Sequence, residues 1–499
     1  MGKFIPSFSS CIWMGLLTVF FFLAIWNIIQ KKHSVLRNYP IIGYIRYIAE
    51  WLGPYLRDYF YARDREQLPF NRAQRTWVYE ASENIDTTIG FGTTRNLKTT
   101  GAIYFVDSPF PILQREVVKA KAITVGKNCR YPYTTNSLIN ISAMSYGSIS
   151  KNAIKALSYG AYKAGCWLNT GEGGLSSYHL EGGCDIVAQI GTAKYGYRDK
   201  KGNLSDEELR KAAAYPQVRM FEIKLSQGAK PGKGGLLPAK KVTKEIAAIR
   251  DIEPYKDSIS PNRFPEISNS NELLDFIHHV RTVTGKPTGF KVVLGNYDWL
   301  DILCQEIIKR GKEYAPDFIT LDGAEGGSGA APVTLADYMG LPLSESLPAL
   351  VDTLVEYDLR DRIKIIASGK LITPEMVAWA LCVGADFVNS ARGFMFSLGC
   401  IQALRCHKNT CPTGIATHSQ WLTRGLDPIS KAERVNNYVR NLTYEVGVIC
   451  HSCGVDEPRE LRRHHVRIVS ANDTSVSLEE IYPPKEPGSK LKNKKGTSD

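Results

Sequence analysis

Residues 363–393 read IKIIASGKLITPEMVAWALCVGADFVNSARG. They begin with a short β-branched run, Ile363 to Ala367, and end with another, Phe387 to Asn389. Between the two runs, the pair Thr373-Pro374 is typical of a helix start and Gly384 of a helix end. The stretch therefore predicts a strand, a helix and a second, parallel strand.

The same alternation of short apolar runs with longer amphipathic segments extends over the chain from about residue 135. Eight such units favour an α/β fold closed as a (β/α)8 TIM barrel. No GxGxxG motif follows a first strand, so a doubly wound Rossmann sheet is disfavoured. The predicted strands are Leu138 to Ala143, Cys166 to Asn169, Asp185 to Ile190, Phe221 to Leu225, Phe290 to Leu294, Phe318 to Leu321, Ile363 to Ala367 and Phe387 to Asn389.

Polar and glycine-rich segments follow most of the predicted strands. The active site of such a barrel lies at the carboxyl ends of its strands, so we expect the chemistry in these segments. They are Ser142 to Gly147, Asn169 to Gly174, Gln227 to Gly235, Asp322 to Gly329, Ser368 to Lys370 and Ser390 to Gly393.

The last two of these loops follow the seventh and eighth predicted strands, where barrels commonly bind phosphate through backbone N–H groups. Gly369 and Gly393 would let the backbone approach a phosphate, and Lys370 or Arg392 would add positive charge. As isolated strings these residues are more typical of ordinary turns. Their position in the barrel is what favours a phosphate site.

Three charged residues of the barrel segment are further candidates. Lys291 lies in the predicted strand FKVVLG, where a buried lysine is costly unless it faces an anion or an electron-rich ring such as a flavin. The alternative is a lysine at a strand end that faces solvent. Glu172 and Lys230 lie in glycine-rich loops, which can hold one side chain against a ligand near the main chain. Each is also consistent with a surface charge, and their occurrence on one barrel face makes them acid/base candidates.

The chain has 11 cysteines, and three of them, Cys400, Cys406 and Cys411, lie close together in the sequence, with Pro412 after the last. Their spacing is unlike that of zinc fingers, which use short paired intervals and a fourth ligand. Three close thiolates suit an iron–sulfur cluster that lacks one iron. A fourth ligand from elsewhere would instead permit a four-iron cluster, and buried structural cysteines remain the third alternative.

A second cysteine pattern is Cys450-x-x-Cys453. It is consistent with a redox pair or with half of a metal site. No second pair of matching spacing accompanies it, so structural cysteines are favoured here.

The N-terminal region contains an uncharged apolar run from Cys11 to Ile29, long enough to cross a hydrocarbon core of roughly 30 Å as a helix. The run is longer than the apolar part of a signal peptide, and no small-residue cleavage site follows it. Lys31, Lys32, Arg37 and Arg46 follow the run and Lys3 precedes it, so we expect a single-pass membrane protein whose catalytic part faces the cytoplasm. A reducing compartment also suits thiolate ligands.

These patterns divide the 499 residues into five expected parts. Residues 34–130 begin as an aromatic and basic collar, which either packs on the catalytic domain or lies at the membrane surface. The tail is rich in Lys, Pro, Gly and Ser and is expected to be disordered and attracted to anionic lipid. The parts are a transmembrane anchor (1–33), the membrane-proximal collar (34–130), the barrel domain (131–430), a helical extension (431–480) and the basic tail (481–499).

The net charge of +12 does not indicate a nucleic-acid partner. Basic residues are interleaved with acidic ones along the chain, and neither zinc-finger spacing nor an aromatic and basic groove pattern accompanies them. We therefore expect no nucleic acid among the partners.

Taken together, the loops resemble the central FMN-binding domain of glutamate synthase and its stand-alone relatives. The resemblance spans about residues 135–420. Its strings are SAMSYGSIS, LNTGEGG, EIKLSQGAKPGKGG with LPAKKVTKEIAAIR, LDGAEGGSGAAP, and LGCIQALRCHKNTCPTGIAT. It implies a (β/α)8 barrel, an FMN cofactor and a [3Fe–4S] cluster that passes electrons to the flavin.

The resemblance also implies residue roles. Cys400, Cys406 and Cys411 would bind the cluster, and FMN would deliver hydride to 2-iminoglutarate, which forms from 2-oxoglutarate and ammonia. The catalytic pair Glu172 and Lys230 would surround the 2-oxo acid with Gln227, and Arg250 would bind a carboxylate. The residues implied at FMN are Ala143, Met144, Ser145, Asn169, Lys291, Gly369, Lys370, Arg392 and Gly393.

The chain departs from the family at several points. The apolar run stands where larger members have an amidotransferase domain, so we expect free ammonia or a separate glutaminase subunit as nitrogen source, and a ferredoxin or a reductase as electron donor. Leu236 replaces a glutamine near the substrate and Lys233 an acid, which affects the choice of 2-oxo acid. Two alternatives therefore remain, an amine-dependent transferase similar to N-methylglutamate synthase and a membrane-bound flavin and Fe–S electron-transfer module.

Overall fold

The computed structural model describes residues 8–31, 33–116, 120–472 and 474–492. The chain forms two compact units, Met1–Thr76 and Trp77–Asp499, so that it divides inside the predicted collar. Lys3, Lys32, Lys494 and Lys495 lie outside the described residues.

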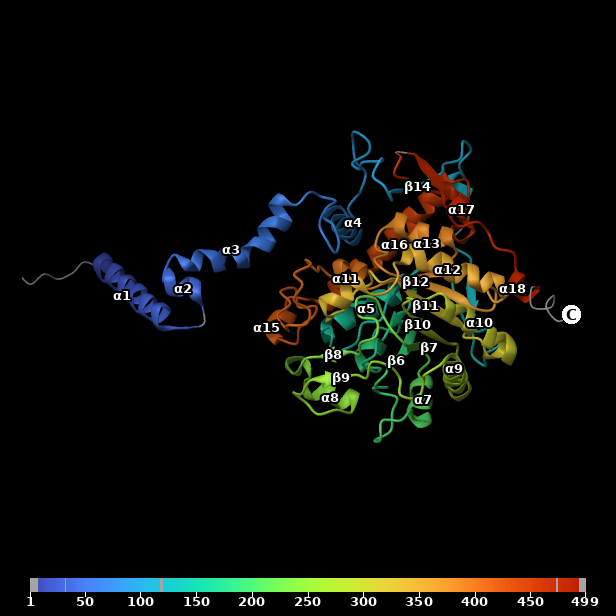
Figure 1. The fold of residues 1–499 in the computed structure, drawn as a ribbon, viewed down its shortest axis with the longest axis horizontal. Helices are drawn as coiled ribbons and strands as arrows, with labels where there is room; N and C mark the ends of the chain where they lie inside the picture. The colour runs from blue at the N-terminus through green and yellow to red at the C-terminus, as the bar shows by residue number, and fades with distance from the viewer. Residues whose placement is uncertain (1–7, 32, 117–119, 473, 493–499) are drawn as a thin grey trace, which may run out of the picture. The chain divides into compact units, whose positions relative to one another are not determined.

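The first unit consists of helices (Figure 1). Its helices are α1 (Phe8–Ile29), α2 (Ser34–Asn38) and α3 (Gly43–Leu56), followed by a π-helical turn (Arg57–Tyr61). Within α1, Ile12–Ile29 has a mean hydropathy of 2.2 and is long and apolar enough to cross a membrane. The polar Asn27 is buried near its end, where its amide donates to the Pro40 carbonyl at 2.7 Å. This bond fixes the turn between α1 and α3.

The second unit is built on a closed barrel of eight parallel strands, which confirms the predicted α/β barrel. The strands of the barrel, in order around it, are β4 (Ile139–Ile141), β5 (Leu168–Asn169), β6 (Ile186–Ile190), β7 (Val218–Lys224), β10 (Thr288–Val292), β11 (Phe318–Asp322), β12 (Lys364–Ser368) and β13 (Phe387–Ser390), and β13 pairs with β4 to close it. Each predicted strand overlaps one of these. The strands could be recognised because their outward residues pack beneath helices and are therefore apolar.

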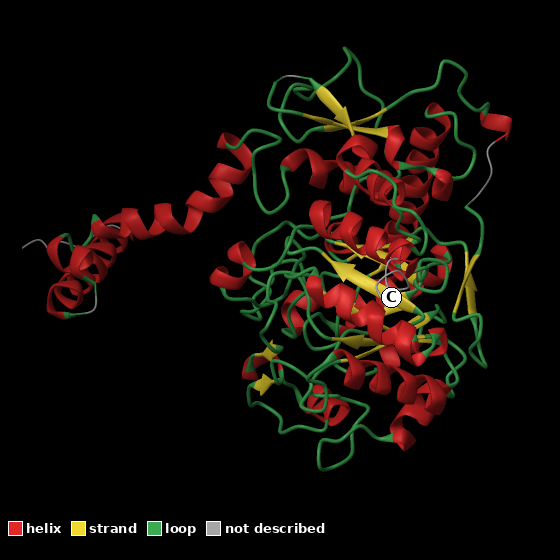
Figure 2. Ribbon diagram, turned by 45° about the vertical axis from the view of Figure 1, so that its right-hand side comes forward, coloured by secondary structure: helices red, strands yellow, loops and turns green. Residues whose placement is uncertain are grey.

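Helices surround the barrel (Figures 1 and 2). The predicted helix after residue 373 is α13, with Thr373 before it, Pro374 first and Gly384 (φ 123°) at its end. The longer helices are α4 (Arg72–Glu83), α5 (Lys151–Ala164), α7 (Asp206–Ala213), α9 (Ser270–Thr284), α10 (Asp298–Arg310), α12 (Leu343–Glu356), α13 (Pro374–Val383) and α16 (Pro428–Ser452). The shorter ones are α6 (Ser177–Leu180), α8 (Lys244–Arg250), α11 (Val333–Tyr338), α14 (Arg392–Ser397) and α15 (Gln420–Thr423).

The amino end of the barrel is filled by apolar side chains. Val125 and Tyr133 belong to the hairpin of β2 (Ile123–Val125) and β3 (Tyr133–Thr135), which closes this end. They pack against a cluster from the strands and their ends, namely Trp167, Val187, Met220, Phe318, Ile366 and Phe387. The polar side chains of the barrel interior therefore lie toward the carboxyl ends of the strands.

The segment after the barrel is more than the helical extension expected for residues 431–480. The helix α16 packs against α5, where a Cβ on Gly160 would come within 2.5 Å of Val435. Beyond it, β14 (Val466–Val469) pairs with β15 (Ser475–Ser477) and with β1 (Ile103–Phe105). This small sheet was not predicted, because its strands are short and far apart in the chain.

The expectation of a disordered tail from residue 481 is wrong for residues 481–492. Ser489–Lys492 form the short helix α18. The Lys490 amine lies 2.6 Å from the Asp301 carboxylate and 3.0 Å from that of Glu356, so two acids hold it to the barrel helices. Residues 493–499 lie outside the described residues.

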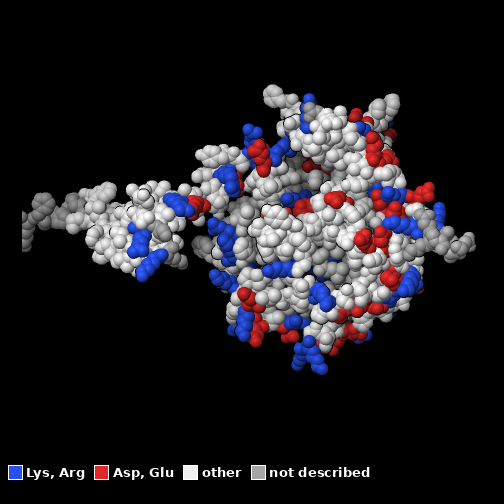
Figure 3. All heavy atoms as spheres, viewed as in Figure 1, with Lys and Arg blue, Asp and Glu red and all other residues white. Residues whose placement is uncertain are grey.

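Charge on the face shown in Figure 3 is mixed. Acidic and basic side chains alternate over it, and no broad single-sign field is seen there.

Candidate functional site

Nearer the carboxyl ends of the strands, the barrel interior is lined by a layer of polar side chains. Successive side chains of a strand point to opposite faces, so Met220, Glu222 and Lys224 of β7 face inward while Phe221 and Ile223 face the helices. The Glu222 carboxylate is 1% exposed. It accepts hydrogen bonds from three buried donors, which are the side chains of Asn169 (2.8 Å), Gln189 (2.7 Å) and Thr320 (2.5 Å).

Two buried ion pairs lie at the carboxyl end of the strands. The Lys224 amine is 3.0 Å from the Glu172 carboxylate, and the Lys291 amine is 3.3 Å from that of Asp322. The Asp322 carboxylate also accepts the Gly228 N–H at 2.8 Å, which fixes the loop after β7. Lys291 therefore faces the interior as predicted and not solvent.

Glu172 is held by positive charge. Burial raises the pKa of its carboxyl, but the charges of Lys224, Lys230 and Arg250 outweigh burial and lower the pKa to about 2. Glycines surround the side chain. A Cβ on Gly235 would lie 2.6 Å from Glu172 Oε1, and one on Gly191 would lie 2.6 Å from Glu172 Cβ. The carboxylate is thus ionised and confined to one position.

Two cations complete the surroundings of Glu172. Lys230 is 6% exposed, and burial together with the charge of Lys224 lowers the pKa of its amine to about 8. Arg250 is 4% exposed, and burial lowers the pKa of its guanidinium. Its Nη2 donates to Ser145 Oγ and to the Tyr146 carbonyl, each at 3.3 Å, whereas its buried Nε has no partner among the described residues.

Gln227 points elsewhere. Its amide donates to the Gly327 carbonyl at 3.2 Å, so it connects the loop after β7 to the glycine-rich loop after β11. The predicted substrate residues Glu172, Lys230 and Arg250 thus form one electrostatic group, and Gln227 lies on the neighbouring loop contact.

The loops after β4 and β5 are interlocked. The Met144 N–H donates to the Asn169 carbonyl at 3.5 Å, and a Cβ on Gly171 would lie 2.6 Å from the Ser145 nitrogen. The Asn169 side chain both donates to Glu222 and accepts the Gly171 N–H at 3.0 Å. Ala143 to Ser145 and Asn169, predicted together for one ligand, therefore lie side by side.

The glycines of the two predicted phosphate loops are required for different structural reasons. Gly369 (φ 145°) and Lys370 (φ 52°) both have a left-handed backbone at the end of β12. Burial lowers the pKa of the Lys370 amine, whereas Glu325 and Asp337 raise it. At Gly393, a Cβ would collide with the Tyr438 hydroxyl, so packing against α16 is sufficient to require this glycine.

Arg392 joins the barrel to the cysteine segment. Its guanidinium donates to the Ser328 carbonyl at 2.7 Å and lies 4.0 Å from the Cys406 sulfur. On the other side, the buried Lys241 amine donates to the carbonyls of Cys406 (3.2 Å) and Ser148. Two cations therefore border this segment.

The three predicted cluster ligands lie in one segment. Cys411 is buried, and Cys400 and Cys406 are partly so. Burial raises the pKa of the Cys400 thiol to about 11, while Arg392 lowers it. Within the described residues, no group of three or more His, Cys, Asp or Glu side chains is arranged to hold a metal ion.

Cys450 and Cys453 are buried at the end of α16. Burial raises the pKa of their thiols to about 12 and about 11, and Cys450 Sγ donates to the Val455 carbonyl at 3.0 Å. Both are protonated at neutral pH, which agrees with a structural role.

Four residues of the site had no role assigned from the sequence: Glu222, Lys224, Lys241 and Asp322, the last of which begins one of the predicted loops. The strand FEIKL contained the signal for the first two. In a strand buried on both faces, charged residues at alternate positions must share the face that lines the barrel. Lys241 had no such signal, because it is in a short 3-10 turn whose partners are far away in the sequence.

Comparison with known proteins gives two kinds of match. The family model "Conserved region in glutamate synthase" matches residues 107–456. The glutamate synthase large subunit-like protein YerD of Bacillus subtilis (strain 168) is 41% identical over 492 residues, with 91% of this chain and 93% of that protein covered. The archaeal glutamate synthase [NADPH] of Methanocaldococcus jannaschii is 33% identical over 68% of this chain, which spans 64% of that protein.

Among solved structures, a mandelate oxidase variant with a monooxide FMN adduct matches with a TM-score of 0.45. It is 13% identical, with 79% of this chain and 92% of that chain covered.

Proposed function

This chain belongs to the glutamate synthase family, whose members are oxidoreductases that act on CH–NH2 groups, and we propose that it forms glutamate or a related amino acid by reductive amination. The observation that carries the proposal is the ionised Glu172 carboxylate among Lys224, Lys230 and Arg250 at the carboxyl end of the barrel. Three cations against one carboxylate leave an excess of positive charge, which suits a substrate with two carboxylates.

The charged residues of the site have different proposed roles. Lys230 and Arg250 bind and orient the carboxylates of 2-oxoglutarate, and the Arg250 Nε, which has no partner in the described part of the chain, is available for this. Glu172 accepts a proton from the attacking ammonia and returns it to the hydroxyl group that leaves as water. The carboxylate, ionised again, then stabilises the positive charge of the imine. Ammonia and the 2-oxo acid yield the imino acid and water, and the imino acid takes up one hydride and one proton to yield the amino acid.

FMN is the proposed source of that hydride. The set around the barrel mouth fits a flavin mononucleotide, because Lys291 is a buried cation of the interior and Lys370 and Arg392 are cations beside the ends of β12 and β13. The residues that would hold FMN are Ala143, Met144, Ser145, Asn169, Lys291, Gly369, Lys370, Arg392 and Gly393. When bound, FMN would supply two-electron chemistry at the carboxyl end of the barrel.

The decisive experiment is anaerobic. The detergent-purified protein is reduced chemically, and the flavin absorption band is followed after 2-oxoglutarate and ammonium are added together. Reoxidation with an equivalent amount of glutamate is expected, because the site holds the oxo acid and the base together. A flavin that stays reduced with all 2-oxo acids and amines would contradict the amination proposal and would favour the electron-transfer module.

Leu236 makes the nitrogen source worth testing. It is 42% exposed beside Gly235 and presents an apolar group where the family has a glutamine. Methylamine in place of ammonium separates the alternatives in the same assay. N-methylglutamate as the preferred product would establish the amine-dependent transferase.

The pH dependence is expected to report Lys230. A 2-oxo acid needs the charged amine, and burial lowers the pKa of this amine to about 8, so binding is full below pH 8 and is lost as the pH rises through that value. The kcat/KM for 2-oxoglutarate, measured at a fixed concentration of free ammonia, should therefore fall about tenfold per pH unit above 8. In Lys230→Arg the fall should vanish up to pH 10, since arginine stays charged. The same break in that variant would assign it to another group.

We also propose a [3Fe–4S] cluster on Cys400, Cys406 and Cys411. Family membership, the spacing of the three thiols and the two bordering cations, Arg392 and Lys241, support it. Among the described residues, no three His, Cys, Asp or Glu side chains are arranged to hold a metal ion. We therefore expect the segment that contains the three cysteines to change conformation when iron and sulfide bind.

The cluster is tested by chemical analysis of anaerobically reconstituted protein. Cys406→Ser is expected to lose at least about 90% of bound iron and acid-labile sulfide, because a hydroxyl is a poor ligand for this iron. Cys304→Ser is the matched control, since that thiol is buried in α10, far along the chain from this segment. Equal iron in Cys406→Ser and in the unsubstituted protein would refute the assignment.

For localisation, we propose a single-pass anchor formed by α1, with the barrel on the cytoplasmic side. Support comes from the apolar window Ile12–Ile29 and from the basic residues that follow it. The protein should remain in the membrane pellet after an alkaline carbonate wash, and Phe20→Arg should release a large part of it, because a charge at mid-span is costly. Complete release of the unsubstituted protein would exclude the anchor.

A further inference from the structure

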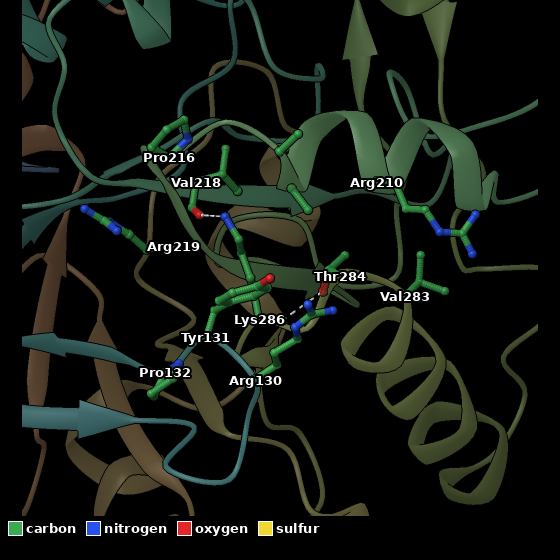
Figure 4. Close-up of a pocket in the computed structure, with 12 residues that line it drawn as sticks. Arg130, Tyr131, Pro132, Arg210, Pro216, Val218, Arg219, Val283, Thr284 and Lys286 are labelled. Carbon is green, nitrogen blue, oxygen red and sulfur yellow. Dashed lines mark hydrogen bonds between the residues drawn. The ribbon is translucent and has the colours of Figure 1, made fainter.

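A cavity of about 460 Å³ lies at the amino end of the barrel, at the opposite end of β7 from Lys224. It is lined by the loop before β3, the end of α7, the start of β7 and the turn between α9 and β10 (Figure 4). The seven residues of β7 span roughly 20 Å, so the cavity is separate from the proposed active site.

The cavity is strongly basic. Its lining includes Arg130, Arg210, Arg219 and Lys286 and no acidic residue. Arg210 and Arg219 have carboxylate partners outside the lining, Asp206 at 3.5 Å and Asp185 at 2.7 Å.

For the other two cations, the described part of the chain supplies no carboxylate partner. Lys286 is 8% exposed, and its amine donates to the carbonyls of Tyr215 (3.3 Å) and Val218. Among the described residues, neither Lys286 nor Arg130 forms an ion pair. Burial, together with the charge of Arg219, lowers the pKa of the Lys286 amine to about 8, so a nearby anion would be stabilised and would raise that pKa again.

An aromatic face lies beside these cations. In Figure 4 the side chains of Arg130, Tyr131 and Lys286 lie together at the centre of the view. The Tyr131 ring is half exposed and lies close to Gly285, where a Cβ would come within 3.1 Å of it. The backbone bond from the Tyr131 N–H to the Gly285 carbonyl, at 2.8 Å, holds the two segments together. The cavity is therefore preformed.

We propose that this cavity binds a phosphate-bearing anion with two or more negative charges. Arg130 and Lys286 supply the charge, the Thr284 hydroxyl lies in the same lining, and the volume accommodates ligands up to the size of a nucleotide. The Tyr131 ring provides a surface on which a base or other flat group can stack.

The test is calorimetric titration of the full-length protein in detergent with inorganic pyrophosphate. Saturable binding is expected that weakens with added salt, and Arg130→Gln should weaken it at least tenfold. Lys211→Gln is the matched control, because Lys211 lies in the same helix as Arg210 but pairs with Glu207 and Glu208 outside the cavity. It should leave the affinity unchanged within twofold.

Two further titrations define the ligand. ATP binding tighter than pyrophosphate, with the difference lost in Tyr131→Leu, would identify a nucleotide, and equal affinities would identify a simple phosphate compound. The proposal is overturned if no saturable binding occurs, if Lys211→Gln weakens binding as much as Arg130→Gln, or if citrate binds more tightly than pyrophosphate. Arg130→Gln should not change the rate of amination. The binding result at the cavity therefore stands by itself, even if the proposed amination reaction is not observed.

Discussion

Replacing Glu172 with glutamine is expected to lower the rate of glutamate formation from 2-oxoglutarate and ammonia by about 100- to 10,000-fold. The amide has the size of the carboxylate but neither accepts a proton nor stabilises the cationic imine. It also removes the 3.0 Å ion pair with Lys224, which leaves that buried amine without its partner. The rate is measured as reoxidation of the reduced protein in single turnover.

The control for Glu172→Gln is Glu181→Gln, a carboxylate on the barrel surface that pairs with Lys155. Both variants should bind FMN in the same amount as the unsubstituted protein, so that a loss of rate in Glu172→Gln reflects the chemistry and not the fold. Retention of more than a tenth of the original rate in Glu172→Gln would remove this residue from the mechanism.

Gly235→Ala is expected to lower the same rate about 10- to 100-fold. A methyl group there would lie 2.6 Å from Glu172 Oε1, so the carboxylate must move away from Gly235, which disturbs the 3.0 Å ion pair of its other oxygen with Lys224. Gly191 lies on the backbone side of the same side chain, where even a Cβ on residue 191 would come within 2.6 Å of Glu172 Cβ. Misplacement of a catalytic group by about 1 Å is enough for an effect of this size.

Gly329→Ala serves as the matched control, since it also adds a methyl group to a glycine-rich loop of the barrel mouth but meets nothing within 4 Å. Its rate should stay within twofold of the original. If Gly235→Ala behaved like Gly329→Ala, the position of Glu172 would be adjustable, and the confinement of its carboxylate would not matter for catalysis.

Much of the candidate site could be predicted, because its glycine-rich loops can be recognised from short stretches of sequence. Glycine runs such as those around Glu172 and Lys230 mark close approach of the backbone, and the structure shows that approach at Gly171 and Gly235. Gly393 shows the limit of this reasoning. The sequence indicates a phosphate, whereas the structure gives contact with Tyr438 as a sufficient reason for the glycine.

The sequence by itself determined the barrel, the order of its strands and the loops at its carboxyl end, because the periods of strands and helices are local properties. The tertiary structure decided which charges meet. Glu172 comes from the loop after β5 and Lys224 from β7, and the basic cavity is built from four separate segments. Register, side-chain parity and burial set such contacts, and burial sets the charge a residue carries, as at Lys230, whose pKa of about 8 depends on burial and on the charges beside it.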